Sequence, residues 1–281
     1  MTATARLLPD GRRLHLNHGP IDLIVEAWGA PAAVRAGHAA ATARFSGLLA
    51  DLVAELPALR ASEPRPLTGP VARRMAAAVA PFRPAFVTPM AAVAGAVAED
   101  VLAALVAGGG IARAYANNGG DIALHLAPGT SLTAAIAGTP GAPRVTITHA
   151  DPVRGIATSG WRGRSWSLGV ADAVTVLAAS AAQADAAATM IANAVDLPGH
   201  PAITRRPARA MQAGSDLGDR MVTVAVGPLT AAETAAALDR GAQAAAAFRA
   251  RGLIVAAALF LGGQRRIAGP LALPAAEPAH A

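Results

Sequence analysis

Cysteine is absent from this chain of 281 residues, and so is lysine, so that all 24 basic residues are arginine. Without cysteine there are no disulfides, thiolate metal sites or cysteine nucleophiles, and such a composition is typical of a reducing compartment. Without lysine the phosphate-binding P-loop is excluded. We therefore expect a cytoplasmic protein.

Aromatic residues are also scarce, at 3%, although 53% of the chain is hydrophobic. The core must then be built from small aliphatic side chains, which favours close packing of helices. The net charge of +6 comes from arginines spread along the chain. Because neither a basic stripe nor a stacking platform is visible, we expect no nucleic-acid partner. The longest apolar runs, 253–261 and 90–98, are too short to span a bilayer, so we expect no membrane.

Local patterns predict an α+β fold, because helices and antiparallel strands come in blocks rather than in strict alternation. A turn at 17–20 separates two short apolar runs and predicts a hairpin. Thr230 with Glu233 three residues later predicts a capping box. The remaining elements are helices at 31–56, 71–80, 89–106, 181–195 and 230–249, a meandering antiparallel sheet of short strands between 111 and 178, an irregular excursion at 197–217, and strands at 221–226, 253–260 and 265–267.

The first candidate site motif is Asn117-Asn118-Gly119-Gly120-Asp121, where a strand ends, turns and restarts. One interpretation is a plain hairpin loop, because Asn-Gly is a strong hairpin signal. The other is a ligand contact, because the glycines let a ligand approach the backbone while Asn118 and Asp121 present an amide and a carboxylate.

The second motif runs from Gly155 to Gly160 and contains Thr158 and Ser159. It lacks the Gly-x-Ser-x-Gly spacing of a hydrolase elbow. Its N–H and hydroxyl groups suit a loop that binds phosphate or a carbonyl, with Arg162 and Arg164 as charge partners. The alternative is a polar turn with solvated arginines.

Asp185 and Thr189 form the third motif, since residues four apart on a helix share one face and their oxygens can converge on a hard cation. A solvated helix edge, or a charge favoured by the helix dipole, is the alternative. The seven histidines show no ligand spacing, which argues against zinc.

These motifs, in this order, resemble the UPF0280 family, a set of uncharacterised proteins placed near the ApbE-like flavin transferases. The resemblance covers most of the chain. It is carried by the segments LHLNHGPIDLIVEA, PMAAVAGAVAE, NNGGDIAL, GIATSGWRGRSWSLGVADAVTVLA, ADAAATMIANAVD and SDLGD.

The resemblance implies an ApbE-like, T-fold-related domain over residues 1–273, in which antiparallel sheets pack with helices and a ligand cleft lies between two intimately packed lobes. Residues 274–281 would form a disordered tail. It also implies FAD and Mg²⁺ as cofactors, with cleavage of the FAD pyrophosphate and transfer of FMN to an acceptor protein. Carried over by motif, Asp185 and Thr189 would hold the metal. The flavin pocket would be formed by Gly119, Gly120, Asp121, Thr158, Ser159 and Gly160. The chemistry of the motifs themselves adds Asn118 and Arg164 to these candidate cofactor-binding residues.

One segment departs from the ApbE pattern. Where those enzymes carry His-x-x-Asp-Pro-x-Thr-Gly, this chain has Ser167 to Thr175, in which Asp172 keeps a carboxylate as the catalytic candidate. Three hypotheses remain. The protein is an ApbE-like transferase; or a pocket protein for a pterin or another heterocycle, with an accessory role in one-carbon or sulfur metabolism; or an assembly partner whose glycines only make turns. The first two predict a small-molecule nucleotide or heterocycle, a partner protein and a homo-oligomer.

Overall fold

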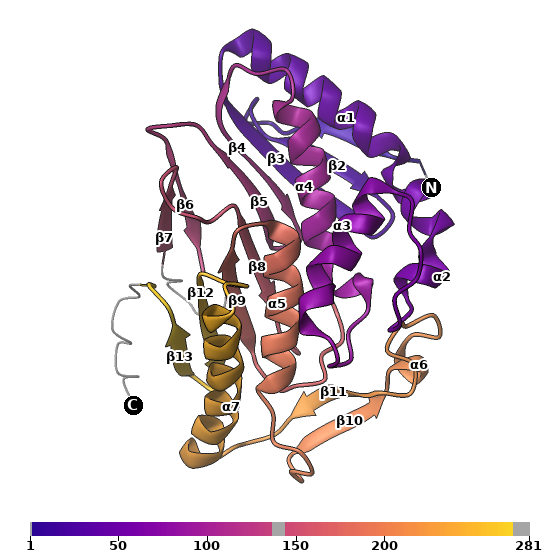
Figure 1. Cartoon of the computed structure of the whole chain (residues 1–281), viewed down its shortest axis with the longest axis vertical. Helices are drawn as coiled ribbons and strands as arrows, with labels where there is room; N and C mark the ends of the chain where they lie inside the picture. The colour runs from indigo at the N-terminus through magenta and orange to yellow at the C-terminus, as the bar shows by residue number, and fades with distance from the viewer. Residues whose placement is uncertain (1, 137–143, 272–281) are drawn as a thin grey trace.

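The computed structural model describes residues 2–136 and 144–271, and it has an α+β fold. One nine-stranded antiparallel sheet runs through the molecule in the order β1-β2-β3-β4-β5-β8-β9-β12-β13. The long helices lie on one face of this sheet (Figure 1). The predicted division into two lobes stays a prediction, and the predicted tail lies outside the described residues.

The sheet is built from two halves with the same order of elements. In the first half a hairpin is followed by helices and then by a second hairpin, and the second half repeats this order. The first half comprises β2 (Leu14–His18), β3 (Ile21–Gly29), α1 (Pro31–Ala54), α2 (Leu56–Leu59), α3 (Pro70–Val79), α4 (Val93–Val106), β4 (Ile111–Asn118) and β5 (Asp121–Leu126). The second half comprises β8 (Gly155–Ser159), β9 (Ala173–Ala178), α5 (Ala181–Ala194), α7 (Ala231–Ala250), β12 (Ala256–Leu261) and β13 (Gln264–Ala268).

Three additions complete the described fold. Strand β1 (Thr4–Leu7) extends one edge of the sheet by pairing with β2. A separate hairpin of β6 (Ser131–Ala135) and β7 (Arg144–Thr148) connects the two halves. Between α5 and α7 the chain forms β10 (Ile203–Pro207), α6 (Ala208–Met211) and β11 (Met221–Val226).

Both faces of the sheet are buried in the second half, by different layers. On one face alternate strand residues such as Val174 and Val176 pack against the helices. On the other, Leu177 and Phe260 pack with Ile136 and Ile147 of the β6–β7 region. Because successive strand residues point to opposite faces, one strand serves both layers.

Small residues set the distance between the layers on the helical side. A Cβ on Gly95 of α4 would lie 2.2 Å from the carbonyl oxygen of Ala181, and one on Gly155 of β8 would lie 2.2 Å from that of Ser180. The first two peptide groups of α5 are therefore approached closely, the Ser180–Ala181 peptide by β8 and the Ala181–Ala182 peptide by α4, and no side chain fits at either contact. The low aromatic content predicted this kind of packing.

Most predicted elements are confirmed, with small shifts at their ends. The capping box is present, since the Thr230 hydroxyl accepts from the Glu233 N–H while the Glu233 carboxylate accepts from the Thr230 N–H. Strand β1 was not predicted. The excursion at 197–217 is more regular than predicted, because β10 pairs with β11. The predicted meander is also divided, since β6 and β7 pair only with each other among the described strands.

One helical stretch, Pro89–Val106, is long and apolar enough to cross a membrane by length and composition alone. It consists of a short 3-10 helix, Pro89–Ala92, followed by α4. More than half of it is buried inside the protein, where α4 packs against β4, β5 and α5. Core helices have the same properties.

Candidate functional site

The sequence motifs meet at one end of the sheet, where β4 turns into β5 and β8 ends. Asn118 pairs with Asp121 across the turn, and β5 pairs with β8 through Ile122 and Ile156. The backbone N–H of Thr158 donates a hydrogen bond of 3.1 Å to Oδ1 of Asp121. The first two motifs are therefore adjacent.

The Asn117–Asp121 segment forms the predicted tight hairpin, and its contact with a ligand stays a prediction. Gly119 and Gly120 have φ values of 65° and 114°, which other residues rarely adopt. Asn117 Oδ1 accepts from the Gly120 N–H at 2.8 Å. Asn118 lies on the helical face, where its Nδ2 donates to the Ala94 carbonyl at 3.2 Å and ties the turn to the start of α4.

Asp185 reaches the same place from α5. Its Oδ2 accepts a hydrogen bond of 3.0 Å from the backbone N–H of Gly95, in the first turn of α4. The residue at the N-cap position of α4, Ala92, has no side chain that could do this. Asp185 thus caps another helix, at the end where the helix dipole favours negative charge.

Asp121 and Asp185 influence each other electrostatically. Burial raises the pKa of Asp121 to about 7, against a hydrogen bond from the Thr158 N–H that lowers it. Burial also raises the pKa of Asp185 well above its usual range, and the negative charge of Asp121 raises it further. No ion pair in the described parts of the chain involves either carboxylate, and no positively charged group contributes to either pKa shift. Two neighbouring carboxylates without a counter-charge are an arrangement that a cation stabilises.

The hydroxyl-bearing residues divide between the two faces. Thr189 lies one turn beyond Asp185 on α5, so the two residues share a helix face. Thr158 turns its side chain the other way, because its hydroxyl is 2.9 Å from that of Thr175, which pairs with it across β8 and β9. Ser159, the next residue, then shares the face of the carboxylates. Thr158 reaches Asp121 through its amide only.

Arg164 is the cation nearest to the glycine turn. It lies in the loop between β8 and β9, and its Nη2 donates to the carbonyl of Pro20 at 3.0 Å. Its Nη1 would be 3.1 Å from a Cβ on Gly119. The guanidinium therefore bridges the two hairpins of the first half from outside, and its exposed position leaves it accessible to an anion.

Asp172 is held by other partners. Its Oδ1 accepts from Arg162 Nε at 2.6 Å, and its Oδ2 accepts from the Gly262 N–H at 2.8 Å. A Cβ on Gly160 would come within 2.6 Å of the Asp172 carbonyl oxygen, so only glycine fits there. These contacts tie the loop to the turn between β12 and β13, and the predicted catalytic role of Asp172 stays a prediction.

Sequence reasoning missed two contributors to this region. Gly95 supplies the amide that Asp185 accepts, and its signal was a lone glycine in an alanine-rich helix. Asp216 accepts from the Thr88 hydroxyl at 2.5 Å, which fixes the entry to the 3-10 helix before α4. Asp216 belongs to the SDLGD motif, to which no role was given.

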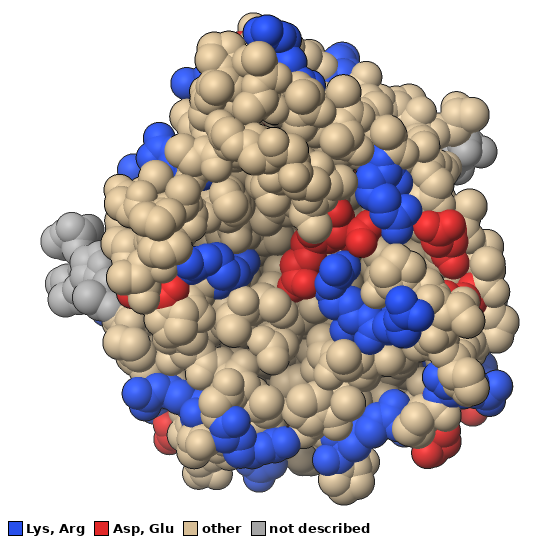
Figure 2. Space-filling view, turned by 45° about the horizontal axis from the view of Figure 1, so that its top comes forward, with Lys and Arg blue, Asp and Glu red and all other residues tan. Residues whose placement is uncertain are grey.

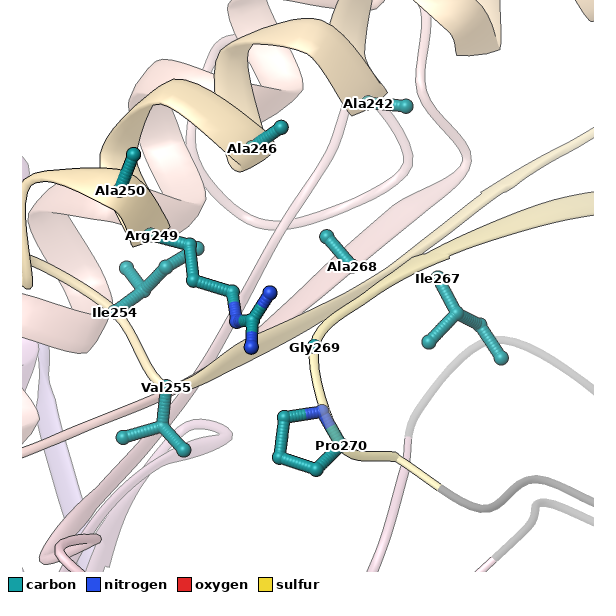
Figure 3. Close-up of a pocket in the computed structure, with 10 residues that line it drawn as sticks. All are labelled: Ala242, Ala246, Arg249, Ala250, Ile254, Val255, Ile267, Ala268, Gly269 and Pro270. Carbon is teal, nitrogen blue, oxygen red and sulfur yellow. The ribbon is translucent and has the colours of Figure 1, made fainter.

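Two grooves lie away from the carboxylate pair. The larger, of about 660 Å³, lies between α7 and β13 (Figure 3). The smaller, of about 290 Å³, is lined by Arg74, Glu99, His125 and Arg154 among others. Neither is lined by Asp121 or Asp185. Figure 2 shows a hollow in the helical face with basic and acidic side chains interspersed around it, without a continuous basic stripe on this face.

Among the described residues, no group of three or more His, Cys, Asp and Glu side chains could hold a metal ion. The coordination shell of a cation at this end of the sheet would have to be completed by hydroxyl and carbonyl oxygens, by water or by a ligand. That coordination is ordinary for Mg²⁺.

A family model described as AbpE bacteria matches residues 5–267, nearly the whole chain. The chain belongs to this family. It is also similar to proteins named UPF0280. It is 39% identical over 141 residues to one from Methanothermobacter thermautotrophicus, covering 46% of this chain and 50% of that protein.

Two further relatives support the UPF0280 resemblance. The chain is 38% identical over 130 residues to a UPF0280 protein from Methanothrix thermoacetophila, covering 45% of this chain and 52% of the relative. It is 43% identical over 114 residues to UPF0280 protein MJ1526 from Methanocaldococcus jannaschii, covering 38% of this chain and 45% of the relative. The chain spans about half the length of the curated relatives it matches.

Proposed function

We propose that this protein binds a flavin nucleotide, FAD in the first instance, together with Mg²⁺, and cleaves the FAD pyrophosphate or transfers FMN to an acceptor protein. The observation that carries the proposal is the pair Asp121 and Asp185, which meet without a counter-charge beside the first amides of α4. The resemblance to ApbE-like enzymes, together with the match to the family model described as AbpE bacteria, supports the proposal.

The residues present fit a magnesium ion. Mg²⁺ is typically held by one or two carboxylates, with phosphate oxygens and water completing its octahedron. Asp185 and Thr189 would hold it from α5, and Asp121 would face it from β5. The raised pKa of both carboxylates is the expected property of ligands without their cation. When bound, Mg²⁺ offsets the charge of the pyrophosphate and stabilises the leaving phosphate.

The turn at Gly119 and Gly120, together with Arg164, would bind the nucleotide. A Cβ on Gly120 would meet nothing within 4 Å, so a ligand can lie directly on this backbone. Arg164 would contact phosphate oxygens with its paired N–H groups. Its side chain now lies against Gly119, and it must leave that contact to admit a ligand. Ser159 can donate its hydroxyl from the adjacent strand end.

Asp172 is the candidate base for an acceptor hydroxyl. Its hydrogen bonds to Arg162 and Gly262 hold the carboxylate in one orientation. Arg162 occupies Oδ1, the oxygen that an acceptor hydroxyl would have to reach. Transfer through Asp172 therefore requires that Arg162 release it, and Arg162→Gln should increase FMN transfer if this is the base.

The decisive experiment incubates the purified protein with FAD, with and without Mg²⁺, and measures FMN and AMP by chromatography. Asp185→Asn keeps an oxygen for the Gly95 amide while removing the charge. The matched control is Asp239→Asn, an exposed carboxylate on α7 that pairs with Arg266. Release that needs Mg²⁺, and is lost in Asp185→Asn alone, supports the proposal. Release unchanged in Asp185→Asn contradicts the metal assignment.

A second candidate function is a pocket protein for a pterin or another flat heterocycle, without turnover of FAD. The observation that favours it is the altered segment around Asp172, whose carboxylate forms structural hydrogen bonds. Titrations with FAD, FMN and a pterin would distinguish the two functions. Tight binding without FMN or AMP release would favour this candidate.

A further inference from the structure

The groove between α7 and β13 carries an inference independent of the carboxylate pair. Ala242, Ala246 and Ala250 line it from α7, one turn apart, while Ile267 and Ala268 line it from β13 (Figure 3). Alanine side chains leave room beside the helix, which the groove occupies with about 660 Å³. The wall is apolar except for Arg249.

Strand β13 lies at an edge of the sheet, since among the described strands it pairs only with β12. The two strands are joined by Gly262 and Gly263, both with positive φ, as in a two-residue hairpin turn. Such a turn is flanked by a hydrogen-bonded pair, here Leu261 and Gln264, and hydrogen-bonded pairs then alternate along the ladder. The backbone N–H and C=O of Ile267 consequently point outward.

The side chains of β13 are arranged on both sides of this edge. Ala268 lies toward α7, whereas Ile267 projects away from it (Figure 3). Ile267 is 38% exposed, which is unusual for a large aliphatic side chain in this protein. A strand added to β13 would place its alternate side chains into the space beside the alanines and against Ile267.

The charge of Arg249 indicates that the partner carries an acidic group. The Arg249 guanidinium extends over the groove toward β13 (Figure 3). None of the ion pairs among the described residues involves Arg249. An acidic side chain or a terminal carboxylate of a bound segment would supply the missing counter-charge. Groove, strand edge and cation together match the recognition mode in which an extended peptide adds to a sheet beside a helix.

We propose that the β13 edge and the groove beside α7 bind an extended segment of a partner protein, with small apolar residues in alternation and an acidic group facing Arg249. Main-chain hydrogen bonds to Ile267 would provide much of the affinity. The space in the groove beside the alanines of α7 would favour side chains of the size of valine. The positive charge of Arg249 would disfavour basic segments.

The test is a fluorescence anisotropy titration of the full chain with a labelled peptide, Thr-Val-Thr-Val-Thr-Asp. Ala246→Leu fills the groove, and Ala247→Leu is its matched control, because Ala247 is exposed on the same helix but does not line the groove. Arg249→Gln is matched by Arg240→Gln. We expect Ala246→Leu and Arg249→Gln each to weaken binding about tenfold or more, and both controls to leave it unchanged.

A peptide methylated at alternate backbone nitrogens keeps the side chains but cannot pair as a strand, so it should not bind. Equal binding of the methylated peptide, or no binding by the parent peptide, overturns the proposal. So does sedimentation that shows a dimer disrupted by Ala246→Leu, because the edge would then be covered by a second copy. Binding that appears only after deletion of residues 272–281 would also overturn it, since the chain itself would be the occupant.

Discussion

The carboxylate of Asp185 lies 3.0 Å from the backbone nitrogen of Gly95, so a side chain from the second half of the protein caps a helix of the first. The contact serves the fold, because it satisfies an amide in the first turn of α4. It also places the carboxylate beside Asp121, which serves the proposed cation site.

Replacement of Asp185 by asparagine should separate these two roles. The amide oxygen of Asn can still accept from Gly95, while the repulsion between the two carboxylates disappears. We expect Asp185→Asn to raise the melting temperature at pH 8 by a few degrees and to remove any stabilisation by Mg²⁺. Thermal unfolding without Mg²⁺ and at a series of Mg²⁺ concentrations measures both effects. A lower melting temperature at pH 8 would contradict the electrostatic argument.

The stability of the metal-free protein should depend on pH through Asp121. Its pKa rises from 3.8 to about 7 on folding, so the native state binds a proton in this range that the unfolded state does not. Stability from this group is then fully present below pH 4 and is lost as the pH rises through about 7. Urea unfolding of the wild type and of Asp121→Asn between pH 4 and pH 8 measures the difference. An equal pH dependence in both proteins would refute the assignment.

Gly95→Ala should destabilise the fold. The added Cβ would lie 2.2 Å from the Ala181 carbonyl oxygen, and a backbone atom cannot move aside cheaply. We expect a loss of about 1–3 kcal/mol in the free energy of unfolding, as for overpacked cores. Gly108→Ala, just beyond α4, is the control, because its Cβ would meet nothing within 4 Å. Similar unfolding curves for both variants would mean that α4 and α5 can separate without cost.

Arg164→Gln should weaken nucleotide binding without unfolding the protein. Its side chain is exposed and makes one hydrogen bond, to the Pro20 carbonyl, so little stability depends on it. A charge-assisted contact with phosphate is worth about 1.5–3 kcal/mol, which corresponds to a loss of about tenfold or more in FAD affinity. Calorimetric titration with FAD measures it. Arg206→Gln serves as the comparison, and an unchanged Kd for Arg164→Gln would remove Arg164 from the site.

Much of this fold is predictable from the sequence because its elements are local. Turn glycines, alternation and the Thr230–Glu233 capping box depend on residues a few positions apart, and these predictions are confirmed. Strand β1 was missed because Thr4–Leu7 is exposed throughout and shows no alternation. Strand β10 was missed because its Arg205 and Arg206 give no apolar pattern; pairing with β11 makes it a strand.

The site was predictable as a set of residues but not as a geometry. The motifs and their order in the sequence identified Asp121 and Asp185 as candidate site residues. Their proximity depends on α5 crossing α4 at Gly95, which no local pattern encodes. The orientation of Thr158 shows the same limit. A hydroxyl in a polar motif suggests a ligand contact, whereas strand alternation turns this one toward Thr175.

The repeated order of elements has a consequence for assembly. Asp121 belongs to the first half of the sheet and Asp185 to the second, and the connection between the halves runs through the β6–β7 hairpin. A chain cleaved between β6 and β7 would yield two fragments, each with one member of the Asp121–Asp185 pair. The paired carboxylates would exist only after the fragments reassociate, so recovery of Mg²⁺ binding would report on fragment complementation.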